Sequence, residues 1–251
     1  MMKDKLNSAM NIGEEMLISG AEIHRVEDSM NRILTALGAS RVDTFIITSS
    51  MVVTVHMPDG AVYTETRRIM GSGTDFERIH KLNSLSRRIC SGEITADKIN
   101  DELAEIGRTK VYPLWLEFIC YAIIAGAFTL FFGGDLMQSL ASLVIGALVR
   151  LVLWISDSTV KNKIFAKFIT SFAATALAYL SVKLSITSGV DEIIIGNIMT
   201  LIPGIGLTTA LRDIFTGDSI TGILRSLEAV ISALAIAAGY FVFVAIGGVL
   251  V

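Results

Sequence analysis

The distribution of apolar and polar positions divides the chain into two parts. In residues 1–110, apolar residues recur at the spacing of helices and strands, among many charged ones. From residue 114 onward they form long runs separated by short polar breaks. The first pattern is typical of a domain in water and the second of membrane spans. We therefore predict an α+β domain over residues 1–110 and an all-α transmembrane domain over residues 111–251.

In the first part, residues 4–37 have a helical pattern that is interrupted at Ser19-Gly20. After the interruption, apolar residues at 3/4 spacing form one stripe, and Gly38 ends the helix. The stripe consists of Ile23, Val26, Met30, Ile33, Leu34 and Leu37. Three β-rich runs and two helices follow, with a hairpin turn at Pro58-Asp59-Gly60. The runs are residues 45–48, 51–56 and 62–67, and the helices are residues 74–91 and 95–106.

The second part contains five apolar segments, each close to the ~20 residues that cross the hydrocarbon of a bilayer. Pairs of small residues, such as Ser142 with Gly146 and Ala174 with Ala178, offer faces for close helix packing. We predict five transmembrane helices. Four of them cover residues 114–132, 136–155, 164–182 and 228–250, and the remaining one begins near residue 190 and continues into residues 197–213.

Composition supports a membrane protein. The chain is 52% hydrophobic and 18% charged, its mean hydropathy is +0.63, and 30 of its 45 charged residues lie in residues 1–110. A net charge of −3 gives no reason to expect nucleic-acid binding. The first residues lack the apolar core of a signal peptide, which favours a cytoplasmic location for the first domain.

Basic residues gather in alternate loops, and the positive-inside rule places those loops in the cytoplasm. The N-terminus is therefore expected in the cytoplasm and the C-terminus outside. The basic residues are Arg108 and Lys110 before the first span, Lys161, Lys163 and Lys167 around the second loop, and Arg212 and Arg225 before the last span.

Three ionisable residues lie in or at the edge of the spans: Glu117, Arg150 and Glu228. One interpretation is that they reach the interface along their stems. The other is that Glu117 pairs with Arg150 in a substrate pathway, because a charge inside the bilayer is costly unless it is paired.

The stretch NIMTLIPGIGLTTALRD, residues 197–213, breaks an otherwise apolar span at Pro203, Gly204 and Gly206. Backbone groups freed by such a break must meet protein or a water-lined cavity. Asn197, Thr200, Thr208 and Thr209 are polar partners of this kind. Transporters place such broken helices at their substrate sites. The alternative is a simple proline kink.

The end of this stretch carries Arg212 and Asp213. A guanidinium binds a carboxylate through two parallel hydrogen bonds, so Arg212 is a candidate ligand for a substrate carboxylate. Asp213 is expected to hold Arg212 when substrate is absent, or to carry a proton.

In the first domain, Glu22, His24, Arg25, Glu27 and Asp28 form a dense ionisable segment. An enzymatic interpretation makes His24 a base beside Asp28, or Glu27 an acid. The other interpretation is a solvated helix face with Glu22–Arg25 and Arg25–Asp28 pairs. The histidines lack metal-ligand spacing, so we expect no metal. No phosphate-binding loop, nucleophile elbow or GxGxxG motif occurs, which argues against an ATP-driven pump or a recognised hydrolase, and we expect no cofactor.

The stretches SGAEIHRVEDSM (19–30) and GNIMTLIPGIGLTTALRDIFTGD (196–218) resemble two motifs of the threonine/serine exporter family. The likeness covers nearly the whole chain. By residue match the cytoplasmic motif takes Gly20, Ala21, Arg25, Val26, Glu27 and Asp28. The membrane motif takes Pro203, Gly204, Leu207, Thr208, Arg212 and Asp213.

The resemblance implies an ion-driven exporter of small amino acids (threonine or serine) or of dicarboxylates such as succinate, in the cytoplasmic membrane of a bacterium or archaeon. Single-chain family members carry a second bundle of about five spans. This chain therefore resembles the longer subunit of a two-component form, completed by a small membrane subunit of four or five spans, with a homo-oligomer as the alternative.

Two other functions remain open on sequence alone. One is a membrane-tethered hydrolase that acts through the 1–110 domain, with His24, Glu27 and Asp28 as its active groups. The other is a membrane scaffold or sensor that transports nothing.

Overall fold

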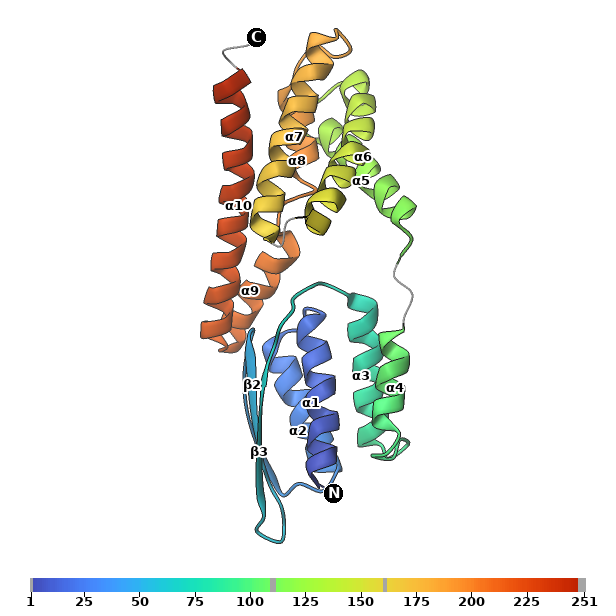
Figure 1. Cartoon of the computed structure of the whole chain (residues 1–251), viewed down its shortest axis with the longest axis vertical. Coiled ribbons are helices and arrows are strands. Elements are labelled where there is room, and N and C mark those ends of the chain that lie inside the picture. Colours follow the sequence, from blue (N-terminus) through green and yellow to red (C-terminus); the bar gives the residue numbers. More distant parts are fainter. Residues whose placement is uncertain (1, 109–111, 160–161, 248–251) are drawn as a thin grey trace. The chain divides into compact units, whose positions relative to one another are not determined.

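A computed structural model describes residues 2–108, 112–159 and 162–247. The chain forms two compact units (Figure 1). The first holds the described residues of Met1–Lys110 together with Thr208–Arg225, and the second holds those of Val111–Leu207 and Ser226–Val251. The expected domain boundary at residues 110–111 and the expected end of the last span at residue 250 lie outside the described residues.

The first unit contains a sheet and four helices of its own, in the order that the sequence predicts. The three strands are antiparallel in the order β1-β2-β3. Helices α1 and α2 lie between this sheet and the pair α3 and α4 (Figure 1). The elements are α1 (Met2–Ile18), α2 (Ile23–Ala36), β1 (Arg41–Ile47), β2 (Ser50–His56), β3 (Val62–Arg68), α3 (Phe76–Cys90) and α4 (Ile99–Gly107).

The apolar stripe on α2 is buried as its spacing predicts, from Ile23 to Leu34, and Leu37 packs against the same core. The interruption before α2 depends on Gly20, which has φ +91°. A Cβ there would lie 2.6 Å from the carbonyl oxygen of Gly73, so only glycine fits. The expected hairpin turn is also present, closed by a 2.8 Å hydrogen bond from the Met57 amide to the Ala61 carbonyl.

Six further helices follow: α5 (Leu114–Phe131), α6 (Leu136–Thr159), α7 (Lys163–Lys183), α8 (Asp191–Ile198), α9 (Gly204–Thr216) and α10 (Ser219–Gly247). Among the helices described, α5, α6, α7 and α10 are long and apolar enough to cross a membrane. The expected span after residue 190 is two short helices, α8 and α9, separated by residues 199–203. Four membrane-length helices are therefore found, and the expected count of five is not confirmed.

Helix α10 begins at Ser219, nine residues before the expected start at Glu228. Its 29 residues extend over about 44 Å, whereas the hydrocarbon of a bilayer is about 30 Å thick. The hydropathy pattern missed the first turns because Arg225 and Glu228 interrupt the apolar run there. The chain is nevertheless helical through both residues.

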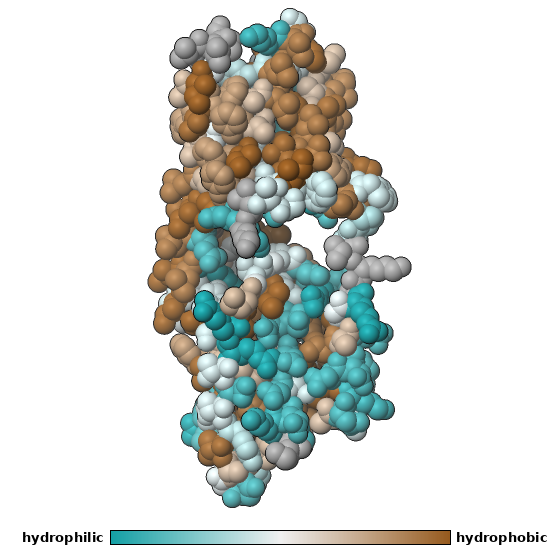
Figure 2. Space-filling model, in the orientation of Figure 1, coloured by the Kyte–Doolittle hydropathy of each residue, from teal (hydrophilic) through white to brown (hydrophobic). Residues whose placement is uncertain are grey.

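Small and hydroxyl-bearing residues fill the interior of the second unit. Thr129 of α5 donates a 2.7 Å hydrogen bond to Ser142 of α6. A Cβ on Gly146 would lie 2.7 Å from the Tyr121 carbonyl oxygen, so α5 and α6 touch through the expected small face. On the face shown in Figure 2, large hydrophobic side chains cover the outside of these helices, and hydrophilic ones cover most of the part of the first unit that residues 2–108 form.

Candidate functional site

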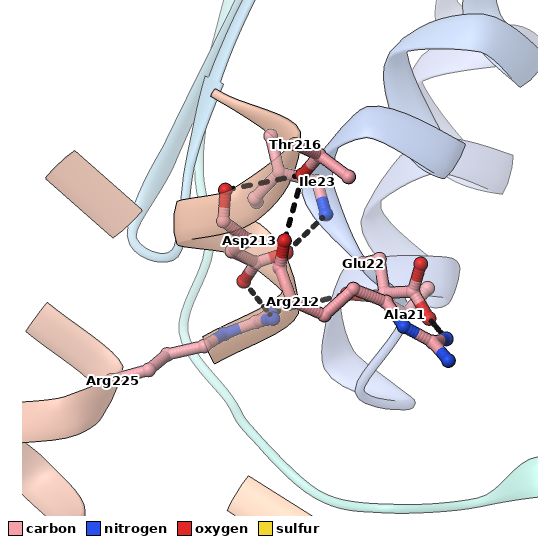
Figure 3. Close-up of polar contacts among 7 residues, drawn as sticks. All are labelled: Ala21, Glu22, Ile23, Arg212, Asp213, Thr216 and Arg225. Atoms are coloured by element: carbon pink, nitrogen blue, oxygen red, sulfur yellow. Dashed lines mark hydrogen bonds and ion pairs between the residues drawn. The ribbon is translucent and has the colours of Figure 1, made fainter. Parts of the chain in front are cut away.

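Two segments of the first unit that are 190 residues apart in sequence lie in contact: the start of α2 and the hairpin formed by residues 208–225 (Figure 3). The hairpin consists of the end of α9 and the first turns of α10, joined at Gly217, which has φ +101°. Gly222 brings the two helices together. A Cβ there would lie 2.4 Å from Ile214 Cγ1 and 2.8 Å from the Ala210 carbonyl oxygen.

A buried ion pair joins the hairpin to α2. The Asp213 side chain is 0% exposed, and its Oδ2 accepts a 2.6 Å hydrogen bond from Arg225 Nη1. Arg225, only 13% exposed, also donates from Nη2 to the Ala21 carbonyl at 3.1 Å. Removing one partner of a buried pair leaves an uncompensated charge and costs about 3–5 kcal/mol. Arg225 and Asp213 thus form a fixed part of the first unit.

Asp213 also caps α2 from a distant part of the chain. The N-cap residue of α2 is Glu22, and its own side chain makes no capping hydrogen bond. Instead, Asp213 Oδ1 accepts from the Ile23 amide, at 3.4 Å. A carboxylate is favourable there because the first amides of a helix lack partners and carry partial positive charge. The end of α9 therefore stabilises the beginning of α2.

A second, exposed ion pair lies beside the buried one. Arg212 Nη1 donates to Glu22 Oε1, and the two side chains are 60% and 26% exposed. The expectation that Asp213 holds Arg212 is therefore wrong: Asp213 faces Arg225, and Glu22 is the partner of Arg212 (Figure 3). Sequence adjacency gave the wrong pair because consecutive residues of a helix do not face each other.

The ionisable segment of α2 does not form the local pairs that its spacing predicts. Asp28 pairs with Arg32 at 2.9 Å rather than with Arg25, and Glu22 pairs with Arg212. His24 and Arg25 are exposed. No hydrogen bond joins His24 to Asp28 in the described part of the chain, so the structure does not assemble the His24–Asp28 dyad, one of the two forms of the enzymatic interpretation.

Glu27 of this segment lies in a perturbed environment. Its Oε1 accepts a 3.2 Å hydrogen bond from the Ile46 amide at the edge of β1. Burial raises the pKa of the Glu27 carboxyl, and the nearby Asp218 carboxylate raises it further. The hydrogen bond from Ile46 and the charge of His24 act in the opposite direction. Glu27 thus links α2 to the sheet and lies near a like charge, Asp218, of the α9–α10 hairpin.

The break between α8 and α9 contains the polar residues that the sequence predicts. Asn197 is fully buried; its amide nitrogen donates to the Ile193 carbonyl at 2.9 Å, and its Oδ1 has no hydrogen-bond partner among the described residues. Thr200 donates to the Asn197 carbonyl at 2.7 Å. Pro203 separates the two helices, and residues 204–208 at the start of α9, including Thr208, are exposed, while Thr209 is half-buried.

Glu117 and Arg150 form the pair expected between α5 and α6. Arg150 Nε donates to Glu117 Oε2 at 2.8 Å, and the guanidinium lies 5.7 Å from the centre of the Tyr121 ring. Arg150 Nη1 is buried and has no hydrogen-bond partner in the ranges that the structure describes. The arginine is thus held inside the unit rather than extended to its surface.

Together, the long apolar helices, their small-residue interfaces and the broken helix define a multi-pass membrane protein. Residues 7–247 match the family model of threonine/serine exporters, ThrE. The chain therefore belongs to the threonine/serine exporter family.

The relatives fall into two kinds. A probable threonine/serine exporter of Mycobacterium tuberculosis and the threonine/serine exporter of Corynebacterium glutamicum are each 25% identical over 94% and 93% of this chain, and over 45% and 49% of their own length. The chain thus spans about half the length of these relatives. The probable succinate transporter subunit YjjP of Escherichia coli is 23% identical over 93% of this chain and 91% of its own length. No solved structure matches.

Arg225 is the residue that the sequence reasoning missed as part of the site. It lies outside both motifs and was used only as a marker of loop charge. A usable signal exists, because Asp213 would need a cation once buried and Arg225 is the next arginine after Arg212. Spacing alone does not distinguish these two partners.

Proposed function

We propose that the chain is a subunit of a secondary-active exporter that moves small amino acids, such as threonine and serine, or dicarboxylates, such as succinate, out of the cytoplasm. Family membership supports export, and the relatives' names supply the two substrate classes. In this proposal an ion gradient drives transport and the N-terminal unit lies in the cytoplasm. A small second membrane subunit completes the pathway, as the word subunit in the name of the relatives of similar length suggests.

The observation that carries the site assignment is the environment of Arg212. Its guanidinium follows the break at Pro203 along the same short helix, it is 60% exposed, and it is paired with one half-buried carboxylate, that of Glu22. An exposed arginine on the helix that follows a break is suited to bind a substrate carboxylate. We assign the residues around the break to the path: Asn197, Thr200, Gly204, Thr208 and Thr209. Arg150 with Glu117 is proposed as a second charged point on it.

Transport by the chain together with its partner tests the proposal. Inside-out membrane vesicles would be assayed for accumulation of labelled threonine, serine and succinate. Arg212→Ala is expected to lower transport efficiency by about 10- to 100-fold, because a hydrogen bond to a charged group contributes about 1.5–3 kcal/mol. The transport efficiency of Arg212→Lys is expected to lie between those of Arg212→Ala and the unmodified protein, since lysine keeps the charge and loses the two-point geometry.

Arg41→Ala provides the matched control. Arg41 is also exposed, by 70%, and pairs with one aspartate, Asp43, but lies on the sheet. Transport should be unchanged in this variant. If Arg212→Ala transports as well as the unmodified protein, Arg212 is not a substrate ligand. If none of the three substrates accumulates with the unmodified protein, the assignment of substrates is wrong.

A further inference from the structure

The two neighbouring ion pairs at the start of α2 differ in how easily they exchange partners. Asp213 and Arg225 are buried, so opening that pair would leave charges without water. Arg212 is exposed and Glu22 is half-buried, so solvent reaches this pair; a solvent-exposed ion pair contributes only about 0.2–1 kcal/mol, a factor of about 1.4 to 5 in an equilibrium constant. Arg212 is therefore the cation that another carboxylate can reach.

The buried pair holds Glu22 from both sides. Arg225 binds the carbonyl of Ala21, and Asp213 binds the amide of Ile23, so the residues before and after Glu22 are both anchored (Figure 3). The Glu22 backbone is fixed at the edge of α2, and only its side chain has to rotate to release Arg212. A displaced Glu22 carboxylate would thus stay within reach of anything bound to Arg212.

Arg212 also has unused donors. Within the described residues its guanidinium is bonded to protein through Nη1, and a guanidinium offers five N–H groups. A substrate carboxylate can take the two-point geometry that Glu22 does not use.

We propose that Glu22 is a specificity determinant that selects zwitterionic amino acids over dicarboxylates. In this arrangement, which rests on the exporter function proposed above, the substrate α-carboxylate replaces Glu22 on Arg212. The displaced Glu22 carboxylate then pairs with the substrate ammonium group. A dicarboxylate has no ammonium group, and its second carboxylate meets the negative charge of Glu22 instead.

The test compares half-saturating concentrations of threonine and succinate in the vesicle assay. In Glu22→Gln, which keeps the side-chain size, the preference for threonine over succinate is expected to fall by about 3- to 10-fold, a change in free energy of about 0.7–1.4 kcal/mol. Glu22→Asp keeps the charge at shorter reach and is expected to retain most of the preference. Asp43→Asn, which removes an exposed acidic partner of an arginine on the sheet, should leave the preference unchanged.

The outcomes separate the two proposals. If Arg212→Ala reduces transport but Glu22→Gln leaves the threonine-to-succinate ratio unchanged, Glu22 does not select substrate, and the exporter proposal stands. If Glu22→Gln raises the preference for threonine over succinate, Glu22 acts against amino acids, and the proposed role of Glu22 is overturned. If Arg212→Ala has no effect, the carboxylate site itself is wrong. Thermal unfolding of each variant excludes a loss of folding as the cause.

Discussion

The two units of the molecule place their large and small side chains in opposite ways. In the first unit the core consists of large apolar side chains, among them Met10, Ile33 and Leu34. In the second unit the buried positions include many small or hydroxyl-bearing residues, such as Thr129, Ser142 and Ala174, whereas large apolar residues such as Phe131 and Phe241 lie outside. The first pattern is suited to water and the second to lipid.

This difference in side-chain placement indicates which interactions stabilise each unit. Burial of apolar surface stabilises a core like that of the first unit wherever water is the alternative environment for its side chains. In the second, lipid is as apolar as the side chains, so close backbone contact and interhelical hydrogen bonds must hold the helices together. The bond from Ser171 of α7 to the Ile236 carbonyl of α10, at 2.7 Å, is one example.

The largest expected contrast comes from one substitution made in both units. Leu34→Ala opens a cavity in the first core and should lower the free energy of unfolding by about 2–5 kcal/mol. Leu234→Ala removes a side chain that is 62% exposed on α10 and should change the free energy of unfolding by less than about 0.5 kcal/mol. Chemical unfolding of the full-length protein in micelles measures both. An equally large loss for Leu234→Ala would mean that protein, rather than lipid, covers this face of α10.

The next contrast concerns small residues in the second unit. A Cβ on Gly196 of α8 would lie 2.2 Å from Thr129 Oγ1 and 2.8 Å from the Ala125 carbonyl oxygen of α5. Gly196→Ala should therefore destabilise the protein by about 1–3 kcal/mol, since the helices must separate.

Gly206→Ala on α9 is its control, because nothing lies within 4 Å of the added atom. There the expected change is a gain of up to about 1 kcal/mol from helix propensity. Thermal unfolding compares the two variants. If both behave alike, contact between α5 and α8 does not depend on the glycine.

The smallest expected effect concerns a charge in the first unit. Glu27 has a raised pKa in the folded protein, so the folded state binds its proton more tightly than the unfolded chain does. The stability that Glu27 contributes is complete below its ordinary pKa of 4.5 and is lost as pH rises through its higher folded pKa. Glu27→Gln, which still accepts from Ile46, should match the unmodified protein at about pH 4 and be the more stable of the two at about pH 7.

Thermal unfolding midpoints measured across that pH range provide the check. Asp43→Asn serves as the comparison, because the pKa of Asp43 is lowered by its hydrogen bond from Arg41 and its effect should have the opposite sign. A Glu27→Gln difference that does not depend on pH would mean that the carboxyl is not titrating in the folded protein.

Periodicity predicted most elements of the fold, because helices and strands depend on contacts a few residues apart. The stripe of α2, the three strands and the apolar helices α5, α6 and α7 follow this rule. Periodicity did not predict that α10 begins at Ser219. A charged residue such as Arg225 marks the end of an apolar run in the sequence, yet here it is buried because it pairs with Asp213.

The candidate site was predicted in its residues but not in its pairs. Arg212, Asp213 and Glu22 were all singled out, yet their partners were assigned along the same helix. The structure joins them across 190 residues instead. Such contacts depend on how the hairpin packs against α2. The sequence alone does not show this packing, so it supports Arg212 and Arg225 equally as the partner of Asp213.

The cap that Asp213 provides for α2 has a consequence for how the protein is made. A ribosome adds about 5–20 residues per second, so the start of α2 is synthesised roughly 10–40 seconds before Asp213. During that interval the first helices of the chain lack the carboxylate at their junction and the arginine that fixes it. The N-terminal unit can therefore reach its final form only after the α9–α10 hairpin has been synthesised. A fragment that ends at residue 108 corresponds to this unfinished stage rather than to the unit in the complete chain.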